Sequence, residues 1–220
     1  ILTNIFGRLQ GIVDNIMVGH LIVYTANAAI GVANQIWLVV IVFIMSVFTG
    51  MSVLVARFVG AGNEDMADRT VYQAFLTAAA ISLFVLAPLG YFGSPALLRL
   101  VNAAPAVQAH ALPFLRIMFV FSFGMLMFFM LSGALRSAGD ARTPMMLGIA
   151  TTVMNILLNI VLIRGRGPIP SYGTAGAAMG TVISTGILAV YSLWRLWHGG
   201  WVVSFPHRHG FKPDWAIIKS

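Results

Sequence analysis

The chain has 220 residues, of which 59% are hydrophobic and only 9% are charged. A soluble domain normally carries about a quarter charged residues, so this composition excludes a protein that faces water on all sides. The net charge of +7 comes from bases scattered singly between apolar runs, which is typical of membrane-protein loops rather than of a nucleic-acid-binding surface. Cysteine is absent, so disulfides and thiolate metal sites are excluded as well.

The longest stretches without a charged residue predict the membrane spans. A spanning helix needs about 20 mostly apolar residues. Five charge-free runs cover residues 15–56, 70–98, 117–135, 143–163 and 167–194. The first holds the end of one span and a second complete span, and each of the others holds one. The sequence therefore predicts an all-α membrane protein, a polytopic bundle of six transmembrane helices. Their approximate ranges are 1–22, 28–56, 70–91, 112–135, 144–163 and 174–197.

Local signals predict where some of these helices begin and end. The apolar start at Ile1 indicates the interior of a first helix rather than a signal peptide. Asn63 is expected to cap the third helix, which has acidic residues in its first turn. Thr143 followed by Pro144 predicts the start of the fifth helix. Residues 93–110, with their glycine and prolines, predict an irregular or interfacial stretch before the fourth helix.

The positions of Lys and Arg predict the orientation. If the first helix runs outward, nine bases fall on the inner side and four on the outer side. Cytoplasmic loops carry the excess of bases, so we expect both ends of this sequence to face the cytoplasm, with the protein in a plasma membrane, in the simplest case a bacterial inner membrane. Three tryptophans near 194–201 are typical of an aromatic belt where the sixth helix leaves the membrane. In the count of bases above, the four on the outer side are Arg99, Arg116, Arg164 and Arg166.

One carboxylate lies inside a predicted span. Asp14 stands within the apolar segment "GIVDNIMVGHL", whereas the other acidic residues fall in loops. Desolvating an ionised carboxylate in hydrocarbon is costly, so such a residue is rare unless it is paired, hydrated or used. Asp14 either makes a static structural contact or changes its charge as an ion binds and leaves. We favour the second interpretation, because apolar residues flank it on both sides.

The fifth and sixth helices carry polar residues that could join Asp14. Asn155 and Asn159 are four residues apart and share one helix face, as do Ala177 and Thr181. Their oxygens with the carboxylate suit a hard cation, or a hydrogen-bond network around a protonated acid. Hydrogen bonding between helices without an ion is the alternative. Beyond a sodium ion or a proton at these residues, the sequence predicts no metal and no cofactor.

Small residues recur on one face of the sixth helix. Gly176, Gly180 and Ser184 are four residues apart. In lipid, small residues at this spacing let helix backbones approach closely. We therefore interpret these three positions as a packing seam against another helix.

Four segments together resemble the MATE (multidrug and toxic compound extrusion) transporters. They are "VDNIMVGHL" in the first helix, "VARFVGAGNEDMADR" after the second, "ALRSAGDARTPM" after the fourth and "GPIPSYGTAGAAMGTVIS" leading into the sixth. The resemblance runs in order across nearly the whole chain. It implies a transporter of twelve helices in two six-helix lobes. Residues 1–198 would be the N-terminal lobe, and 199–220 a cytoplasmic tail or linker towards the second lobe.

The resemblance also implies a function and a set of site residues. MATE transporters export amphipathic, often cationic, compounds by alternating access, driven by the entry of protons or sodium, so we expect an antiporter and no enzyme. By position, Asp14 matches the coupling aspartate, Asn155 an ion-site asparagine, and Ala177 and Thr181 contributors from the sixth helix. Asn159 departs from the DinF-like branch, which usually has aspartate there. Asp14 is then the single charge of this lobe, which favours proton coupling slightly.

The same resemblance sets the expected partners, and two other functions stay open. The partners would be membrane lipid, a small amphipathic or cationic substrate and the second lobe, with no nucleic acid. A related flippase for lipid-linked saccharides would have a similar fold, but usually several bases inside its cavity, and here only Arg8 and Arg116 could lie within a span. An intramembrane enzyme would need a convergent nucleophile or metal set, and the sequence shows none.

Overall fold

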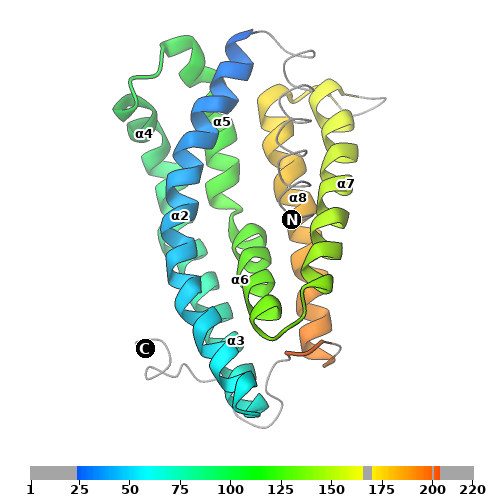
Figure 1. Cartoon of the computed structure of the whole chain (residues 1–220). Helices are drawn as coiled ribbons and strands as arrows, with labels where there is room; N and C mark the ends of the chain where they lie inside the picture. The colour runs from blue at the N-terminus through cyan, green and yellow to red at the C-terminus, as the bar shows by residue number, and fades with distance from the viewer. Residues whose placement is uncertain (1–23, 166–169, 200, 204–220) are drawn as a thin grey trace.

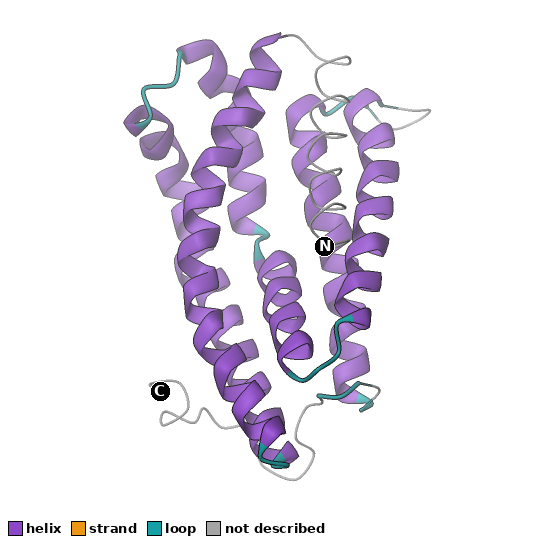
Figure 2. Cartoon of the chain, in the orientation of Figure 1, coloured by secondary structure: helices purple, strands orange, loops and turns teal. Residues whose placement is uncertain are grey.

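The computed structural model describes residues 24–165, 170–199 and 201–203, and within them it contains helices and loops but no strand (Figures 1 and 2). The first predicted helix, 1–22, lies outside the described residues. The helices pack side by side in one bundle, with successive spans running in opposite directions. They are α2 (Tyr24–Gly60), α3 (Glu64–Ala80), two π-helical segments (Ile81–Leu86 and Leu89–Gly93), α4 (Ser94–Leu100), α5 (Pro105–Val120), α6 (Phe123–Ser137), α7 (Arg142–Arg164) and α8 (Gly173–Trp197).

Five membrane spans can be traced through the described residues. α2, α7, α8 and the continuous helix Glu64–Leu100 are each long and apolar enough to cross a bilayer. α5 and α6 are bent by 55° at a short break, and together they are long and apolar enough to form one broken span. These correspond in order to the second to sixth helices expected from the charge-free runs. The fold is therefore that of an all-α polytopic membrane protein.

The helices are longer than predicted, and one predicted irregular stretch is mostly helical. The third span covers Glu64–Leu100 rather than 70–91, and α5 begins at Pro105 rather than near 112. The expectation that 93–110 is irregular was therefore wrong, since its prolines lie in the first turns of α4 and α5, where a missing N–H costs nothing; its expected interfacial position stays a prediction. A helix of 37 residues is about 55 Å long at 1.5 Å per residue, so its ends project beyond the hydrocarbon.

The third span contains two π-helical segments on either side of Pro88. Proline has no N–H to continue the helical ladder, and its ring clashes with the preceding turn. In the first segment the hydrogen bonds run five residues back instead of four, and the backbone N–H of Ala87 donates to the carbonyl of Ser82. The helix therefore passes Pro88 without breaking, and Gly90 is placed against the backbone of α5.

The broken α5–α6 span forms the centre of the bundle. α5 packs against α2 and α8, and α6 packs against α2, α3 and α8. At the break, the hydroxyls of Ser82 and Ser122 are 3.0 Å apart and buried. A Cβ at Gly124 would lie 2.8 Å from the backbone nitrogen of Gly186 in α8, so the bend is held by close backbone contact. The fully buried core side chains here are Leu115, Phe119, Leu126, Met127, Met130, Leu131 and Leu135.

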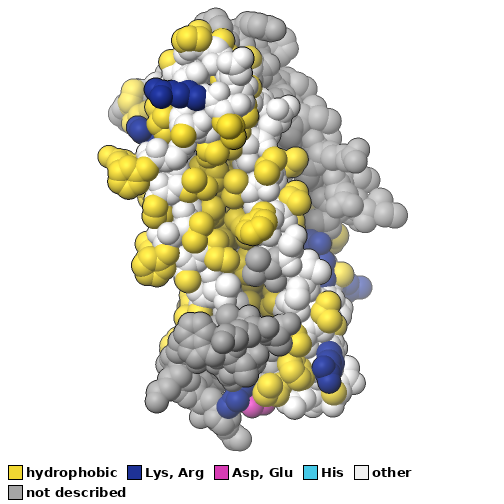
Figure 3. Space-filling model, turned by 90° about the vertical axis from the view of Figure 1, so that its left-hand side faces the viewer, with side chains coloured by type: hydrophobic (Ala, Val, Ile, Leu, Met, Phe, Trp, Pro, Cys, Tyr) yellow, Lys and Arg dark blue, Asp and Glu magenta, His cyan; other side chains and the backbone are white. Residues whose placement is uncertain are grey.

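The outer surface carries the side chains expected of a protein in lipid. Figure 3 shows hydrophobic side chains over most of the middle of one face, with Lys and Arg near its upper end and in its lower half. On α8, Trp194 and Trp197 are exposed, and the Arg195 guanidinium carbon lies 5.8 Å from the Trp201 ring centroid. This arrangement matches an aromatic belt at one membrane interface. Exposed apolar side chains on the spans include Leu38, Val39, Val42, Phe43, Leu83, Phe84, Val153, Leu157 and Val190.

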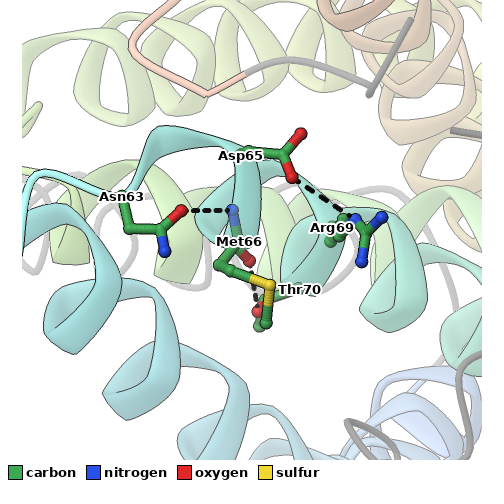
Figure 4. Close-up of polar contacts among 5 residues, drawn as sticks. All are labelled: Asn63, Asp65, Met66, Arg69 and Thr70. Atoms are coloured by element: carbon green, nitrogen blue, oxygen red, sulfur yellow. Dashed lines mark hydrogen bonds and ion pairs between the residues drawn. The ribbon is translucent and has the colours of Figure 1, made fainter. Parts of the chain in front are cut away.

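The end of the bundle where α2 ends and α3 and α7 begin is called here the Gly60 end. Asn63 Oδ1 accepts a hydrogen bond from the backbone of Met66 (3.2 Å), which confirms Asn63 as the cap of α3 (Figure 4). Asp65 pairs with Arg69 one turn later, at 3.5 Å. At α7 the prediction of Thr143 as the cap was wrong. The N-cap position is Ala141, and Asp140, one residue before it, supplies the capping hydrogen bonds, because its Oδ1 accepts from the backbone N–H groups of both Arg142 and Thr143 at 3.0 Å.

Replacing the α7 cap should cost stability in a pH-dependent way. Partial burial pushes the pKa of Asp140 upward, but hydrogen bonds from Thr143 and Arg142, with the Arg142 charge, outweigh it and lower the pKa. We expect Asp140→Ala to lower the free energy of unfolding by about 1 kcal/mol at neutral pH. The ionised cap contributes fully above the unfolded pKa of about 3.9, and this contribution is lost as the pH falls through the lower folded pKa.

The matched control for this experiment is Asn63→Ala, which removes an uncharged cap from α3. Melting temperatures of the purified protein at pH 7 and pH 3 provide the measurement. The loss caused by Asp140→Ala should shrink at pH 3, whereas the loss caused by Asn63→Ala should persist. A difference between wild type and Asp140→Ala that is the same at both pH values would contradict the role of the charge.

Candidate functional site

The predicted polar residues of α7 lie on its buried side. Asn155 and Asn159 are 0% and 1% exposed, although the helix lies at the periphery of the bundle and packs mainly against α8. Thr151 and Thr152, which were not among the predicted site residues, are also buried. Thr151 precedes Asn155 by four residues, so the helical period could have identified it. Their hydroxyls donate to the carbonyls one turn back, those of Leu147 and Gly148.

The structure brings the four described residues of the predicted site into one chain of hydrogen bonds. Asn159 Nδ2 donates to Asn155 Oδ1 at 3.1 Å, and Asn155 Nδ2 donates across the interface to Thr181 Oγ1 at 3.1 Å. Thr181 Oγ1 in turn donates to the carbonyl of Ala177 at 3.2 Å. We call this Asn159–Asn155–Thr181–Ala177 series the polar chain. Asp14, the fifth predicted site residue, lies outside the described residues.

The small residues of α8 make this close approach of the two helices possible. A Cβ at Gly176 would lie 2.6 Å from the carbonyl oxygen of Leu162, and a Cβ at Gly180 would overlap Asn159 Oδ1. Ser184 is fully buried, and its hydroxyl donates to the carbonyl of Thr181 at 3.0 Å. Gly176 and Gly180 therefore face α7, and the absence of a side chain at Gly180 leaves the room that the Asn159 amide occupies.

The polar chain has the chemistry of a site for a small hard cation or for a proton-linked network. Its oxygens are two amide carbonyls, a hydroxyl and a main-chain carbonyl, and all of them are neutral. In the part of the chain that the structure describes, no three His, Asp or Glu side chains come together in a way that could hold a metal ion. A cation in this seam would therefore need its compensating negative charge from elsewhere, and Asp14 is the acidic residue that the sequence places in a span.

The charges of the described residues are unevenly distributed along the bundle. All four described acids lie at the Gly60 end, in the first turns of α3 and in the α6–α7 connection. The opposite end, where α4 ends and α5 begins, is called here the Leu100 end, and its described side chains include arginines but no acid. The described arginines are Arg57, Arg69, Arg136, Arg142 and Arg195 at or near the Gly60 end, and Arg99, Arg116 and Arg164 in the half of the bundle nearer the Leu100 end.

Comparisons with known proteins agree with the architecture. The family model MatE matches residues 1–161. The "Probable multidrug resistance protein NorM" of Thermotoga maritima is 31% identical over 186 residues, 82% of this chain and 39% of that protein. The "Multidrug resistance protein MdtK" of Pectobacterium atrosepticum is 28% identical over 213 residues, 96% of this chain and 46% of that protein. Both are proteins to which this chain is similar over less than half of their own length.

A solved structure shows the same fold. It is an outward-facing conformation of a multidrug resistance MATE family transporter of the MOP superfamily, with a TM-score of 0.83 and 23% identity over 99% of this chain and 47% of that chain. The likeness at this identity concerns the fold alone. This chain thus spans about half the length of the proteins it matches, as expected for one lobe of such a transporter. The family match over residues 1–161, together with the 31% identity to the Thermotoga maritima protein over 82% of this chain, shows that the chain belongs to the MATE family.

Proposed function

We propose that this chain is the N-terminal lobe of a secondary antiporter that exports amphipathic or cationic compounds, driven by proton or sodium entry. The observation that carries the proposal is the polar chain. It links the four described residues of the predicted ion site across a buried interface between two helices. The relatives named for multidrug resistance support the export of such compounds.

The residues present fit a sodium ion or a proton. Amide, hydroxyl and main-chain oxygens are hard ligands, which suit sodium better than a soft metal. Asn155, Asn159, Thr181 and the carbonyl of Ala177 would hold the ion together with Asp14. The ion would supply a positive charge that neutralises the carboxylate when bound. The hydrogen bonds of the polar chain fix the orientation of the two amides, so their dipoles are set in advance of binding.

The orientation is part of this proposal. The Gly60 end would face the cytoplasm in a bacterial inner membrane, because five described arginines lie at or near it and three lie nearer the Leu100 end. The flippase alternative is less well supported. The described base within a span, Arg116, does not point to a lumen lined by bases, since its guanidinium stacks on the exposed ring of Tyr91.

Transport by the complete protein in proteoliposomes tests the function. We impose a proton or a sodium gradient and expect it to drive ethidium, an amphipathic cation, across the membrane in the direction opposite to the ion flow. The gradient that drives ethidium identifies the coupling ion. Collapse of that gradient with an ionophore should stop the movement. Accumulation of a lipid-linked saccharide on the opposite leaflet without any ethidium transport would overturn the antiporter and favour the flippase. Failure of both gradients to drive ethidium would also contradict the proposal.

A further inference from the structure

Arg116 is a charged side chain within a membrane span that forms no salt bridge with an acid of the described residues. Arg116 lies in α5 and is half-buried, and its guanidinium carbon is 5.5 Å from the ring centroid of Tyr91 in the third span. Its Nε is buried and has no hydrogen-bond partner. Stacking on a ring favours the cation but satisfies none of its N–H donors. A buried donor of a charged group without a partner is costly, so this position calls for an anion or an acceptor.

The described part of the protein does not supply that anion. The four described acids lie in α3 and in the α6–α7 connection, at the Gly60 end. Arg116 instead lies about three turns into α5, which begins at the Leu100 end. Arg99, in the last turn of α4, adds a second positive charge at the Leu100 end of the bundle. An anion or acceptor for the Nε of Arg116 would therefore come from outside the described residues.

The surface beside Arg116 is apolar and exposed. Tyr91 and Phe92 are 59% and 78% exposed, and their rings meet edge to face with centroids 5.0 Å apart. Tyr91 is eight residues before Arg99, or about 12 Å along the helix at 1.5 Å per residue. The rings thus lie in the outer part of the span, where aromatic side chains gather at the boundary between hydrocarbon and head groups. We call Arg116, Tyr91 and Phe92 the arginine corner.

We propose that the arginine corner binds the phosphate of an anionic phospholipid in the leaflet at the Leu100 end. The guanidinium would donate to the phosphate oxygens in the bidentate manner that suits its planar fork. Tyr91 holds the guanidinium from one face, and the exposed rings of Tyr91 and Phe92 offer an apolar wall to the acyl chains. This chemistry explains why a charged residue with an unpartnered Nε is placed next to two exposed rings in a membrane span.

Binding of dioleoylphosphatidylglycerol to the complete protein in detergent tests this inference, and transport is not involved in the readout. We expect this lipid to raise the melting temperature of the wild type more than dioleoylphosphatidylcholine does. Arg116→Gln should weaken the apparent affinity for the anionic lipid about tenfold, because a charge-assisted hydrogen bond to a desolvated group is lost. Arg116→Lys should restore part of it, since the point charge remains without the planar fork.

Two further variants separate this site from general electrostatic attraction. Arg99→Gln removes the same charge from an exposed side chain in the same part of the molecule, and it should leave most of the lipid effect in place. Tyr91→Leu keeps every charge but removes the stacked ring, and it should weaken binding less than Arg116→Gln does. If Arg116→Gln binds phosphatidylglycerol like the wild type, the inference is wrong. The inference is also wrong if Arg116→Gln lowers the melting temperature by the same amount with and without phosphatidylglycerol. The anion that pairs with Arg116 would then be an acid of the protein itself.

Discussion

Asp14→Asn in the complete protein should insert and fold normally but lose gradient-driven export. Asparagine keeps the shape of aspartate and removes its charge change, so the variant no longer distinguishes an empty from an ion-bound site. Export of ethidium should fall to the level of protein-free vesicles. By linkage, an ion that binds one conformation better shifts the population towards it, and removing the differential binding removes the shift.

The same linkage predicts how substrate and ion interact in the wild type. A cationic substrate and a coupling ion would both compensate the charge of Asp14, so each should lower the affinity for the other by the same factor. Asp14→Asn should abolish this mutual effect even where residual substrate binding is measurable. Titration of ethidium binding at several proton and sodium concentrations measures the factor directly.

Glu64→Gln is the matched control for Asp14→Asn. It also replaces one carboxylate by an amide, but Glu64 is exposed in the first turn of α3, at the Gly60 end. We expect its export to equal that of the wild type. Export by Asp14→Asn that equals the wild type under the same gradient would assign Asp14 a purely structural role. Loss of export together with loss of folded protein would point to the same structural role.

Gly180→Leu should sharply reduce the yield of folded protein, because the seam between α7 and α8 has no room for a side chain there. Even a Cβ at this position would overlap Asn159 Oδ1, and Asn159 is buried and bonded to Asn155. Relief would require the helices to separate or the amide to leave the polar chain. Overpacking of a core typically costs about 1–3 kcal/mol, and displacing a buried amide adds about 1–3 kcal/mol more.

Alanine at two glycines of the same helix gives the sharpest comparison. Gly180→Ala introduces the overlap with Asn159, whereas a Cβ at Gly186 meets no atom within 4 Å. Alanine favours a helix over glycine by about 1 kcal/mol, so Gly186→Ala should be neutral or stabilising while Gly180→Ala is destabilising. Melting temperatures and the monodisperse fraction in detergent are the readouts. Equal effects of the two substitutions would show that the seam does not constrain Gly180.

Features of this protein that depend on residues close together in the sequence could be predicted from the sequence, whereas contacts between distant residues could not. Hydrophobicity alone predicted the spans, because a bilayer requires about 20 apolar residues to cross it whatever the neighbours are. The helical period placed Asn155 with Asn159, and Ala177 with Thr181, on shared faces, since residues four apart lie side by side. Asn63 was correctly predicted as a cap, because the hydrogen bond is made within one turn.

The misplaced helix ends show where local signals fail. The two prolines in 93–110 suggested an irregular stretch, but they lie in the first turns of α4 and α5, where proline is tolerated. Thr143 was the expected cap of α7, and Asp140 makes the capping hydrogen bonds instead, because the helix begins at Arg142, two residues before the expected start at Pro144. In both cases the same residue types are compatible with two different local structures, so residue type alone does not choose between them.

By itself, the sequence determined the fold class, the order of the spans and the faces on which the polar residues lie, since these follow from composition and helical geometry. Only the tertiary structure decided which faces meet. It joined Asn155 to Thr181 across two helices, bent the α5–α6 span at Ser122 and placed the guanidinium of Arg116 on Tyr91. Such contacts link residues far apart in the chain, and no local period specifies them. They depend on how closely the backbones approach, which here is set by glycines such as Gly176 and Gly180.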